Sequence, residues 1–393
     1  MVDEPITLRD LANQRSRFKK NIVILLISIE AILKAFNIYK FKGEKEKYHS
    51  EKVMRSDFKL QVEILEWIYG ELESLDVSIP IISSFMDLNS LAQSVALVNG
   101  KGIVIKNFPT GETAIKSFFN HDLILNNQMK YPILEKDKIL FQNEIFVKLV
   151  RSSPILSDKL LMGFIPGPAS LLAQLISPEK MLLLSVKNRQ EHTRNSILKK
   201  WIDYTTECSK ILAKYLLKLG FEVFCILEPN AIYLDNARFQ NYLLNPLNNL
   251  IKLIKTNNCP VIFHVCGNST MLFNSFAKLK EVDAFSLDEE VSLKQLSKLI
   301  RDKILIGNSN NKALFLDDER EIFHKSILMQ LVNRDLEKEG RYIPGPGCEI
   351  TFLDENPNKA LLKLKALLKG YDPKLRDYVF QYIDENFLNK VKE

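Results

Sequence analysis

Short apolar runs that end in polar residues recur along this chain, and they constrain its fold more than any other feature. The runs are rich in β-branched and aromatic residues, and most are followed by a turn and a helical pattern. Eight such runs cover residues 77–85, 102–106, 160–165, 221–227, 261–265, 282–287, 303–306 and 348–352. This alternation predicts an α/β protein with a (β/α)8 TIM barrel, whose active site lies on loops at the carboxyl ends of the strands.

Two helical patterns precede the first run and predict an N-terminal extension of the barrel. They cover residues 8–36 and 56–72. The apolar face of the second consists of Phe58, Val62, Leu65, Ile68 and Leu72. We expect a helical segment over residues 1–75, packed on a barrel over residues 76–393. The apolar stretch at residues 22–29 is shorter than the roughly 20 residues of a membrane span, so we interpret it as part of a core helix.

A doubly wound sheet would show the same alternation of strands and helices. Its nucleotide-binding forms carry G-x-G-x-x-G after the first strand or G-x-x-x-x-G-K-[ST], and the sequence has neither in the required place. The segment at residues 190–217 has a strong helical pattern and fits a barrel helix. These observations favour the barrel.

Composition excludes some classes of function. The 54 Lys and Arg residues exceed the 48 Asp and Glu residues by only six and are spread along the chain, which argues against nucleic-acid binding. Five scattered cysteines in a chain of this length do not form a disulfide framework, and no secretion signal is recognisable. We therefore expect a cytoplasmic protein that binds neither nucleic acid nor a membrane. The oligomeric state is left open.

Three residues have the types and positions expected of a metal site. His264 and Cys266 end a short strand, and their spacing of two places both side chains on the same side. Cys348 follows the turn Gly345-Pro346-Gly347 and is a candidate third ligand. Three protein ligands with an open fourth position are typical of catalytic zinc. A buried cysteine is also common as a small apolar residue, so spacing alone leaves both interpretations open.

Several segments together resemble the uroporphyrinogen decarboxylase superfamily, and within it the zinc-dependent corrinoid methyltransferases that act on coenzyme M. Their order and spacing match over roughly residues 50–385. The segments are Met86-Asp87-Leu88, residues 163–174 ("GPF-TLA-QL"), residues 263–268 ("H-x-C-G"), Asp288 (the "-D-" turn), residues 306–308 ("GN-DP") and Pro346-Gly347-Cys348 ("-PGC-").

The resemblance implies a zinc ion bound by His264, Cys266 and Cys348 that activates a small thiol for methyl transfer. For the fourth position before substrate binds, Glu228 is a candidate, with a helix-capping role as the alternative. Asp87 would orient the substrate or cap the following helix, and Asn308 would bind the substrate or form a turn. No D-x-H-x-x-G segment is present, so the methylcobamide would be carried by a separate corrinoid protein.

Two departures from the family pattern bear on function. The decarboxylases carry an arginine-rich segment near the start that residues 15–20 do not reproduce, and they do not use the His/Cys/Cys set. Decarboxylation is therefore the less favoured chemistry. The family's "GN-DP" loop reads Gly307-Asn308-Ser309 here, which leaves the methyl acceptor open among coenzyme M, homocysteine and tetrahydrofolate.

Other classes of protein remain alternatives at this stage. They are a metal-free decarboxylase of the same fold, a non-catalytic relative that binds a corrinoid protein or a tetrapyrrole, and a core-type methionine synthase that takes its methyl group from a corrinoid protein.

Overall fold

The computed structural model describes most of the chain from the second predicted helix onward, with gaps. The described residues are 21–22, 36, 40, 57–75, 77–78, 80–82, 90–101, 105–107, 113–115, 119, 121–132, 138–187, 197–310, 318–348 and 357–375.

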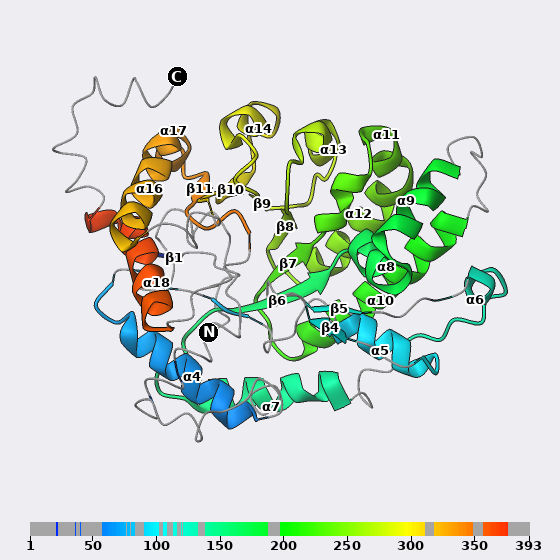
Figure 1. Ribbon diagram of the computed structural model, residues 1–393, viewed down its shortest axis with the longest axis horizontal. Helices are drawn as coiled ribbons and strands as arrows, with labels where there is room; N and C mark the ends of the chain where they lie inside the picture. Colours follow the sequence, from blue (N-terminus) through cyan, green and yellow to red (C-terminus); the bar gives the residue numbers. More distant parts are fainter. Residues whose placement is uncertain are drawn as a thin grey trace.

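Seven parallel strands form the largest sheet in this part of the chain, and they follow one another across it in chain order. Every neighbouring pair is parallel, so a crossover joins each strand to the next. The strands are β3 (Ile81–Ile82), β6 (Leu161–Pro166), β7 (Val223–Leu227), β8 (Val261–Val265), β9 (Ala284–Leu287), β10 (Ile304–Ile306) and β11 (Tyr342–Ile343). This order, with helices between the strands (Figure 1), confirms the predicted fold of the (β/α)8 type.

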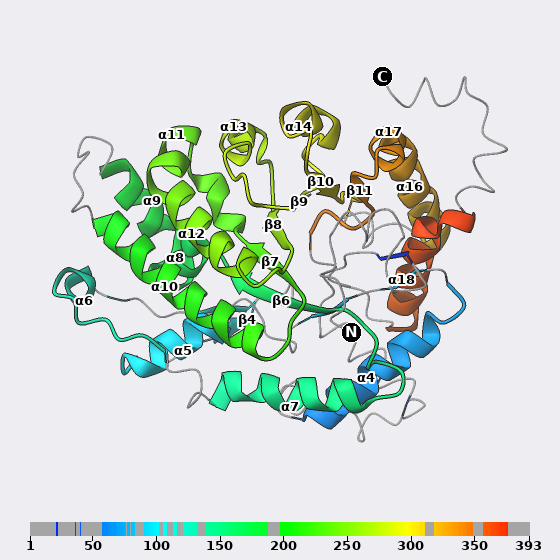
Figure 2. The ribbon, with the colours of Figure 1, turned by 180° about the vertical axis from the view of Figure 1, so that it is seen from behind.

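Helices form the outer layer around these strands, and Figure 2 shows from behind that they succeed one another around the sheet. Those before β7 are α4 (Phe58–Glu71), α5 (Ser90–Val98), α6 (His121–Leu125), α7 (Lys138–Ser152), α8 (Pro168–Ile176), α9 (Pro178–Lys187) and α10 (Ile197–Lys218). Those after β7 are η3 (Pro229–Tyr233), α11 (Asn236–Arg238), η4 (Phe239–Leu243), α12 (Leu244–Lys255), η5 (Thr270–Leu272), α13 (Phe273–Phe276), α14 (Leu293–Leu299), α16 (Glu319–Val332), α17 (Arg334–Lys338) and α18 (Pro357–Tyr371).

The strands are buried on both faces, and their side chains divide between two apolar clusters. Side chains alternate along a strand, so every second residue enters the inner cluster. It consists of Leu160, Met162, Val223, Cys225, Leu227, Ile262, Ala284, Ile304, Ile306 and Ile343. The residues between them, such as Phe224, Phe263 and Phe285, pack against the outer helices. The inner cluster fills the space beneath any site at the carboxyl ends of the strands.

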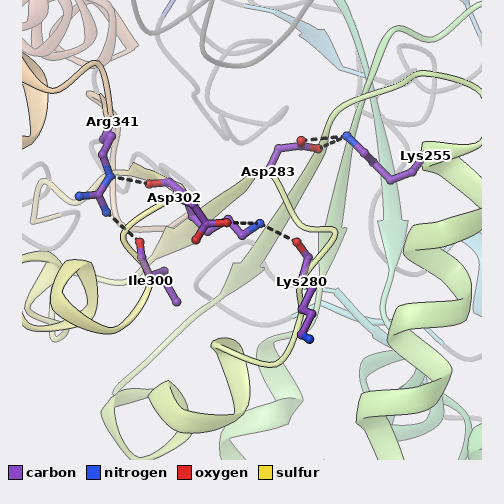
Figure 3. A network of polar contacts seen from close by, with 7 residues as sticks. Lys255, Lys280, Asp283, Ile300, Asp302 and Arg341 are labelled. Carbon is purple, nitrogen blue, oxygen red and sulfur yellow. Dashed lines mark hydrogen bonds and ion pairs between the residues drawn. The ribbon is translucent and has the colours of Figure 1, made fainter.

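A polar network ties together the other ends of the strands. Lys255 of α12 forms an ion pair with Asp283 at 2.8 Å (Figure 3). Asp283 also accepts a hydrogen bond from the Val261 backbone amide. Arg341 donates to the Ile300 carbonyl, as the same figure shows. Contacts on this face of a barrel contribute to stability, because active sites lie on the opposite face.

Both N-terminal helices of the sequence prediction can be compared with the structure in part. The second is confirmed as α4, which Asp57 caps by accepting a hydrogen bond from the Leu60 amide. The first prediction is wrong at Asn21–Ile22, which forms strand β1 and pairs in parallel with β2 (Val77–Ser78). Tertiary pairing has overridden the local helical pattern there. The domain boundary near residue 75 stays a prediction.

Two of the eight predicted strands are corrected by the structure. The run at residues 102–106 contributes to β4 (Ile105–Asn107), which pairs antiparallel with β5 (Thr113–Ile115) in a separate two-stranded sheet. Of the run at residues 348–352 only Cys348 is described, and it lies outside any strand, after β11, which is the last strand in the described part of the chain. Cys348 therefore follows a strand rather than starting one. Residues 349–352 lie outside the described part.

Within the described ranges, no single helix is long and apolar enough to cross a membrane. Only α8 and α9 taken together, bent by 110° between them, reach the required length and composition.

Candidate metal centre

His264 lies at the carboxyl end of β8 and points into the barrel above the inner apolar cluster. It has the same parity in β8 as Ile262, which belongs to that cluster, and only 2% of its surface is exposed. Its Nδ1 atom lies 3.0 Å from the hydroxyl of Ser286 on β9. When Nδ1 carries the proton and donates it to Ser286, the Nε2 atom is left with a free lone pair.

The two cysteines predicted as ligands lie beside this nitrogen atom. Cys266 Sγ is 3.0 Å from His264 Nε2, and Cys348 Sγ is 2.9 Å from Cys266 Sγ. Both cysteines are half-buried and neither forms a disulfide. The three donor atoms lie within 4.8 Å of one another. One nitrogen and two sulfur donors grouped within this distance are a ligand set for a single zinc ion, which binds such donors at about 2.0–2.3 Å, and no fourth donor of the described residues belongs to the group.

Backbone pairing between the loops after β10 and β11 holds Cys348 in place. The Ser309 amide donates to the Gly345 carbonyl and the Gly347 amide donates to the Ser309 carbonyl, both at 3.0 Å. The Ser309 hydroxyl in turn lies 2.5 Å from the hydroxyl of Tyr371 on α18. The loop that carries Cys348 is therefore held in place through a contact with α18.

Glu228 follows β7 and is fully buried, but its carboxylate is directed at the start of α8. It accepts hydrogen bonds from the Ala169 amide at 3.1 Å and from the Ser170 amide and hydroxyl, both at 2.6 Å. Gly167 makes room for it, since a side chain there would collide with the carboxylate. Burial raises the pKa of Glu228 to about 7, although these hydrogen bonds act to lower it. The arrangement is that of a helix cap, and Glu228 is not part of the three-donor group.

Asn308 uses its side-chain amide group within the protein. Its Nδ2 atom donates to the carbonyl oxygens of Asp288 at 2.9 Å and Val291 at 2.7 Å. The residue thus joins the loop after β10 to the loop after β9. The structure brings it to the same end of the sheet as the three donors. Asp87, the other residue predicted to orient the substrate, lies outside the described residues.

Ser286 is a functional candidate that the sequence analysis missed. It is the only polar residue in β9, whose sequence is Ala-Phe-Ser-Leu, and it pairs in register with His264. The signal available in the sequence was a single hydroxyl residue in an otherwise apolar strand, the next strand after the one that carries His264. Reading it required knowing that β8 and β9 are neighbours and in which register they pair.

A cavity of about 570 Å³ lies elsewhere, between α6, α10 and α12. Its lining includes Tyr131, Asp203 and Lys210 but none of the candidate site residues. The candidate metal site therefore lies outside this cavity.

Comparison with known proteins places the chain in a family. It matches the uroporphyrinogen decarboxylase (URO-D) family over residues 74–363, well over half of its length. Its relatives include the uroporphyrinogen decarboxylase of Orientia tsutsugamushi (strain Ikeda), 24% identical over 253 residues that cover 61% of this chain and 70% of that protein. They also include the methylcobamide:CoM methyltransferase MtbA of Methanosarcina acetivorans, 24% identical over 246 residues that cover 61% of this chain and 68% of that protein.

A solved structure, a methyltransferase from Methanosarcina mazei, matches the fold with a TM-score of 0.65 at 18% identity, over 95% of this chain and 98% of that chain. The sequence match and the fold agree, and the chain belongs to the uroporphyrinogen decarboxylase family.

Proposed function

We propose that this protein is a zinc-dependent methyltransferase that moves a methyl group between a corrinoid protein and a small thiol. The observation that carries the proposal is the convergence of His264, Cys266 and Cys348 at the carboxyl end of the barrel strands. Barrel enzymes carry their chemistry at this end. Among the described residues the group consists of one nitrogen donor and two sulfur donors, which matches the three protein ligands of a catalytic zinc site rather than the four of a closed structural one.

Zinc bound there would supply Lewis acidity that removes the proton of a substrate thiol near neutral pH, so that the thiolate can attack a methyl group. The residues of the chain prepare this position. With Nδ1 of His264 protonated, it would donate a hydrogen bond to the Ser286 hydroxyl and leave the Nε2 lone pair for the metal. Cys266 and Cys348 would bind the ion as thiolates, whose negative charge would keep electron density on the metal high and favour a nucleophilic substrate thiolate.

The open position belongs to the substrate in this proposal. To act as a fourth ligand, Glu228 would have to give up its hydrogen bonds from Ala169 and Ser170. We therefore assign Glu228 to holding α8 and Asn308 to holding the neighbouring loops. A direct role of Asp87 in orienting the substrate rests on the family resemblance.

The relatives favour coenzyme M as the first thiol to test, because one of them is a methylcobamide:CoM methyltransferase. Homocysteine and tetrahydrofolate are the other acceptors to be compared. The methyl donor would be a methylcobamide held by a separate corrinoid protein, which would dock over the loops at the carboxyl ends of the strands.

The competing function is decarboxylation of a tetrapyrrole, since another relative is a uroporphyrinogen decarboxylase. The three-donor group favours methyl transfer, because a decarboxylase would have no role for the thiols of Cys266 and Cys348.

Methyl transfer from methylcobalamin to coenzyme M, measured on the zinc-loaded protein, tests the proposal. We expect transfer by the wild type, its loss in Cys348→Ala, and its retention in Cys259→Ala, because Cys259 lies at the opposite end of β8. Uroporphyrinogen is offered in a parallel assay. Decarboxylation that persists in His264→Ala, without methyl transfer to any of the three acceptors, would overturn the proposal.

A further inference from the structure

The turn that follows β9 contacts the loop that carries Cys266. The Asp288 carboxylate accepts a hydrogen bond from the Gly267 amide through Oδ2 at 2.9 Å, and from the Glu290 amide through Oδ1 at 3.1 Å. Gly267 has a positive φ of 73°, a conformation that a glycine adopts without strain. The amide directly after Cys266 is thus fixed by a carboxylate on the neighbouring loop.

The same turn contacts the loop that carries Cys348. Gly347 packs so closely on it that a Cβ atom there would lie 2.5 Å from the Glu289 amide nitrogen and 3.1 Å from the Asp288 carbonyl carbon. Asn308 donates to the Asp288 carbonyl from the loop after β10. The loops after β8, β10 and β11 therefore all rest on the turn that begins at Asp288.

We propose that Asp288 is a positioning residue that sets the separation of Cys266 and Cys348 and so the affinity of the metal site. This inference rests on the metal site proposed above. A carboxylate suits the task because its two oxygen atoms can accept hydrogen bonds from both backbone amides at once. Without the Asp288 carboxylate, the Gly267 amide loses its side-chain hydrogen bond. The loop that carries Cys266 can then move away from the turn at Asp288, on which Gly347 packs.

Asp283 provides a matched control at the other end of the same strand. Asp283 precedes β9, whereas Asp288 follows it. The Asp283 carboxylate also accepts a hydrogen bond from a backbone amide, that of Val261 at the start of β8, at 2.7 Å. It also pairs with Lys255. The two residues thus make the same kind of contact, and only Asp288 makes it next to the thiols.

The experiment compares wild type, Asp288→Ala, Asp288→Asn and Asp283→Ala in two measurements. The first is the zinc dissociation constant, obtained by competition with a chromophoric chelator. The second is the rate at which the metal-free protein forms a Cys266–Cys348 disulfide with diamide, which accepts the two electrons and two protons that the thiols release. Circular dichroism and thermal unfolding establish that each variant is folded.

Asp288→Ala is expected to weaken zinc binding by about 10–100-fold, the effect typical of residues that orient metal ligands, and to slow disulfide formation several-fold. Asp288→Asn retains one acceptor oxygen and is expected to fall between Asp288→Ala and wild type. Asp283→Ala is expected to lower the unfolding temperature and leave both measurements unchanged.

Wild-type values of both quantities in folded Asp288→Ala, or equal losses in Asp283→Ala, would overturn the inference. The disulfide measurement uses no metal and no substrate. It therefore tests the positioning role even if the wild type fails to transfer methyl groups, and that failure would count against the proposed function alone.

Discussion

The Sγ atoms of Cys266 and Cys348 lie 2.9 Å apart, although the two residues are 82 positions apart in the chain. The strands before them, β8 and β11, are not neighbours in the sheet, because β9 and β10 lie between them. The thiols meet because their loops turn toward each other above the inner cluster. No local segment of the chain holds more than two of the three donors, so the metal site exists only in the folded barrel.

Zinc binding should therefore stabilise the native state. A ligand that binds only the folded protein adds about 2.7 kcal/mol at a concentration 100 times its dissociation constant. Thermal unfolding measured with and without zinc should show a higher midpoint for the loaded wild type and no such shift for His264→Ala. Equal shifts in both proteins would place the binding elsewhere.

Ser286→Ala removes the hydroxyl that lies 3.0 Å from Nδ1 of His264 and that would hold the ring in the orientation and tautomer proposed for metal binding. Loss of such a partner typically costs about 10–100-fold in metal affinity, because the imidazole ring is no longer held in one orientation and tautomer. Chelator competition measures the change. Ser326→Ala is the control, since Ser326 is also buried, on α16, and its hydroxyl donates a hydrogen bond to the Phe323 carbonyl. A zinc affinity in Ser286→Ala equal to that of the control would contradict the assigned role.

The five cysteines should differ in reactivity toward a thiol reagent at pH 8. Burial raises the pKa of the Cys208 thiol to about 12 and raises that of Cys225 still further, so both stay protonated. Cys259, Cys266 and Cys348 are only half-buried. Metal-free folded protein should thus react at Cys266 and Cys348 and more slowly at Cys259, whose pKa burial also raises, and zinc should protect Cys266 and Cys348. Mass spectrometry of labelled peptides identifies them, and labelling of Cys225 before unfolding would argue against its place in the barrel interior.

Glu228 should make the protein less stable as the pH rises from about 4.5 to about 7. Burial raises its pKa to about 7 in the folded state, so in this window the folded protein retains a proton that the unfolded chain has lost. Each pKa unit is worth about 1.4 kcal/mol. The stabilisation by protonated Glu228 is complete below the pKa that this residue has in the unfolded chain. It is lost as the pH rises through the pKa of the folded state.

Urea unfolding at several pH values measures this trend. Glu228→Gln cannot titrate, so the free energy of unfolding of wild type relative to the variant should fall across the window. A difference that does not change with pH, or that grows with it, would contradict the burial and partners described for Glu228.

The sequence predicted the barrel because its strands are continuous apolar runs with polar residues at their ends. It also predicted that His264 and Cys266 share one side, which follows from the period of two along a strand. Cys348 was a candidate third ligand because it follows the turn at residues 345–347, and the resemblance to a known family supported it. The structure brings all three side chains together.

The remaining errors have physical causes. Strand β11 is only two residues long, Tyr342–Ile343, and gives almost no periodic signal, so the sequence analysis missed it. Asn21–Ile22 pairs with a segment more than fifty residues away, which no local pattern reveals. Ser286 was missed because its position beside His264 depends on the register between β8 and β9, and the two roles left open for Glu228 differ in a contact with α8 that only the folded structure shows. Both are tertiary relationships.

X-ray absorption at the zinc edge tests the central claim most directly, because it counts the sulfur atoms bound to the metal. The account predicts about one zinc ion per chain with two Zn–S bonds near 2.3 Å, one of them absent in Cys348→Ala, and a third Zn–S bond when coenzyme M is added to the wild type. A protein that holds no zinc after reduction and reconstitution, or holds it without sulfur ligands, would contradict the account.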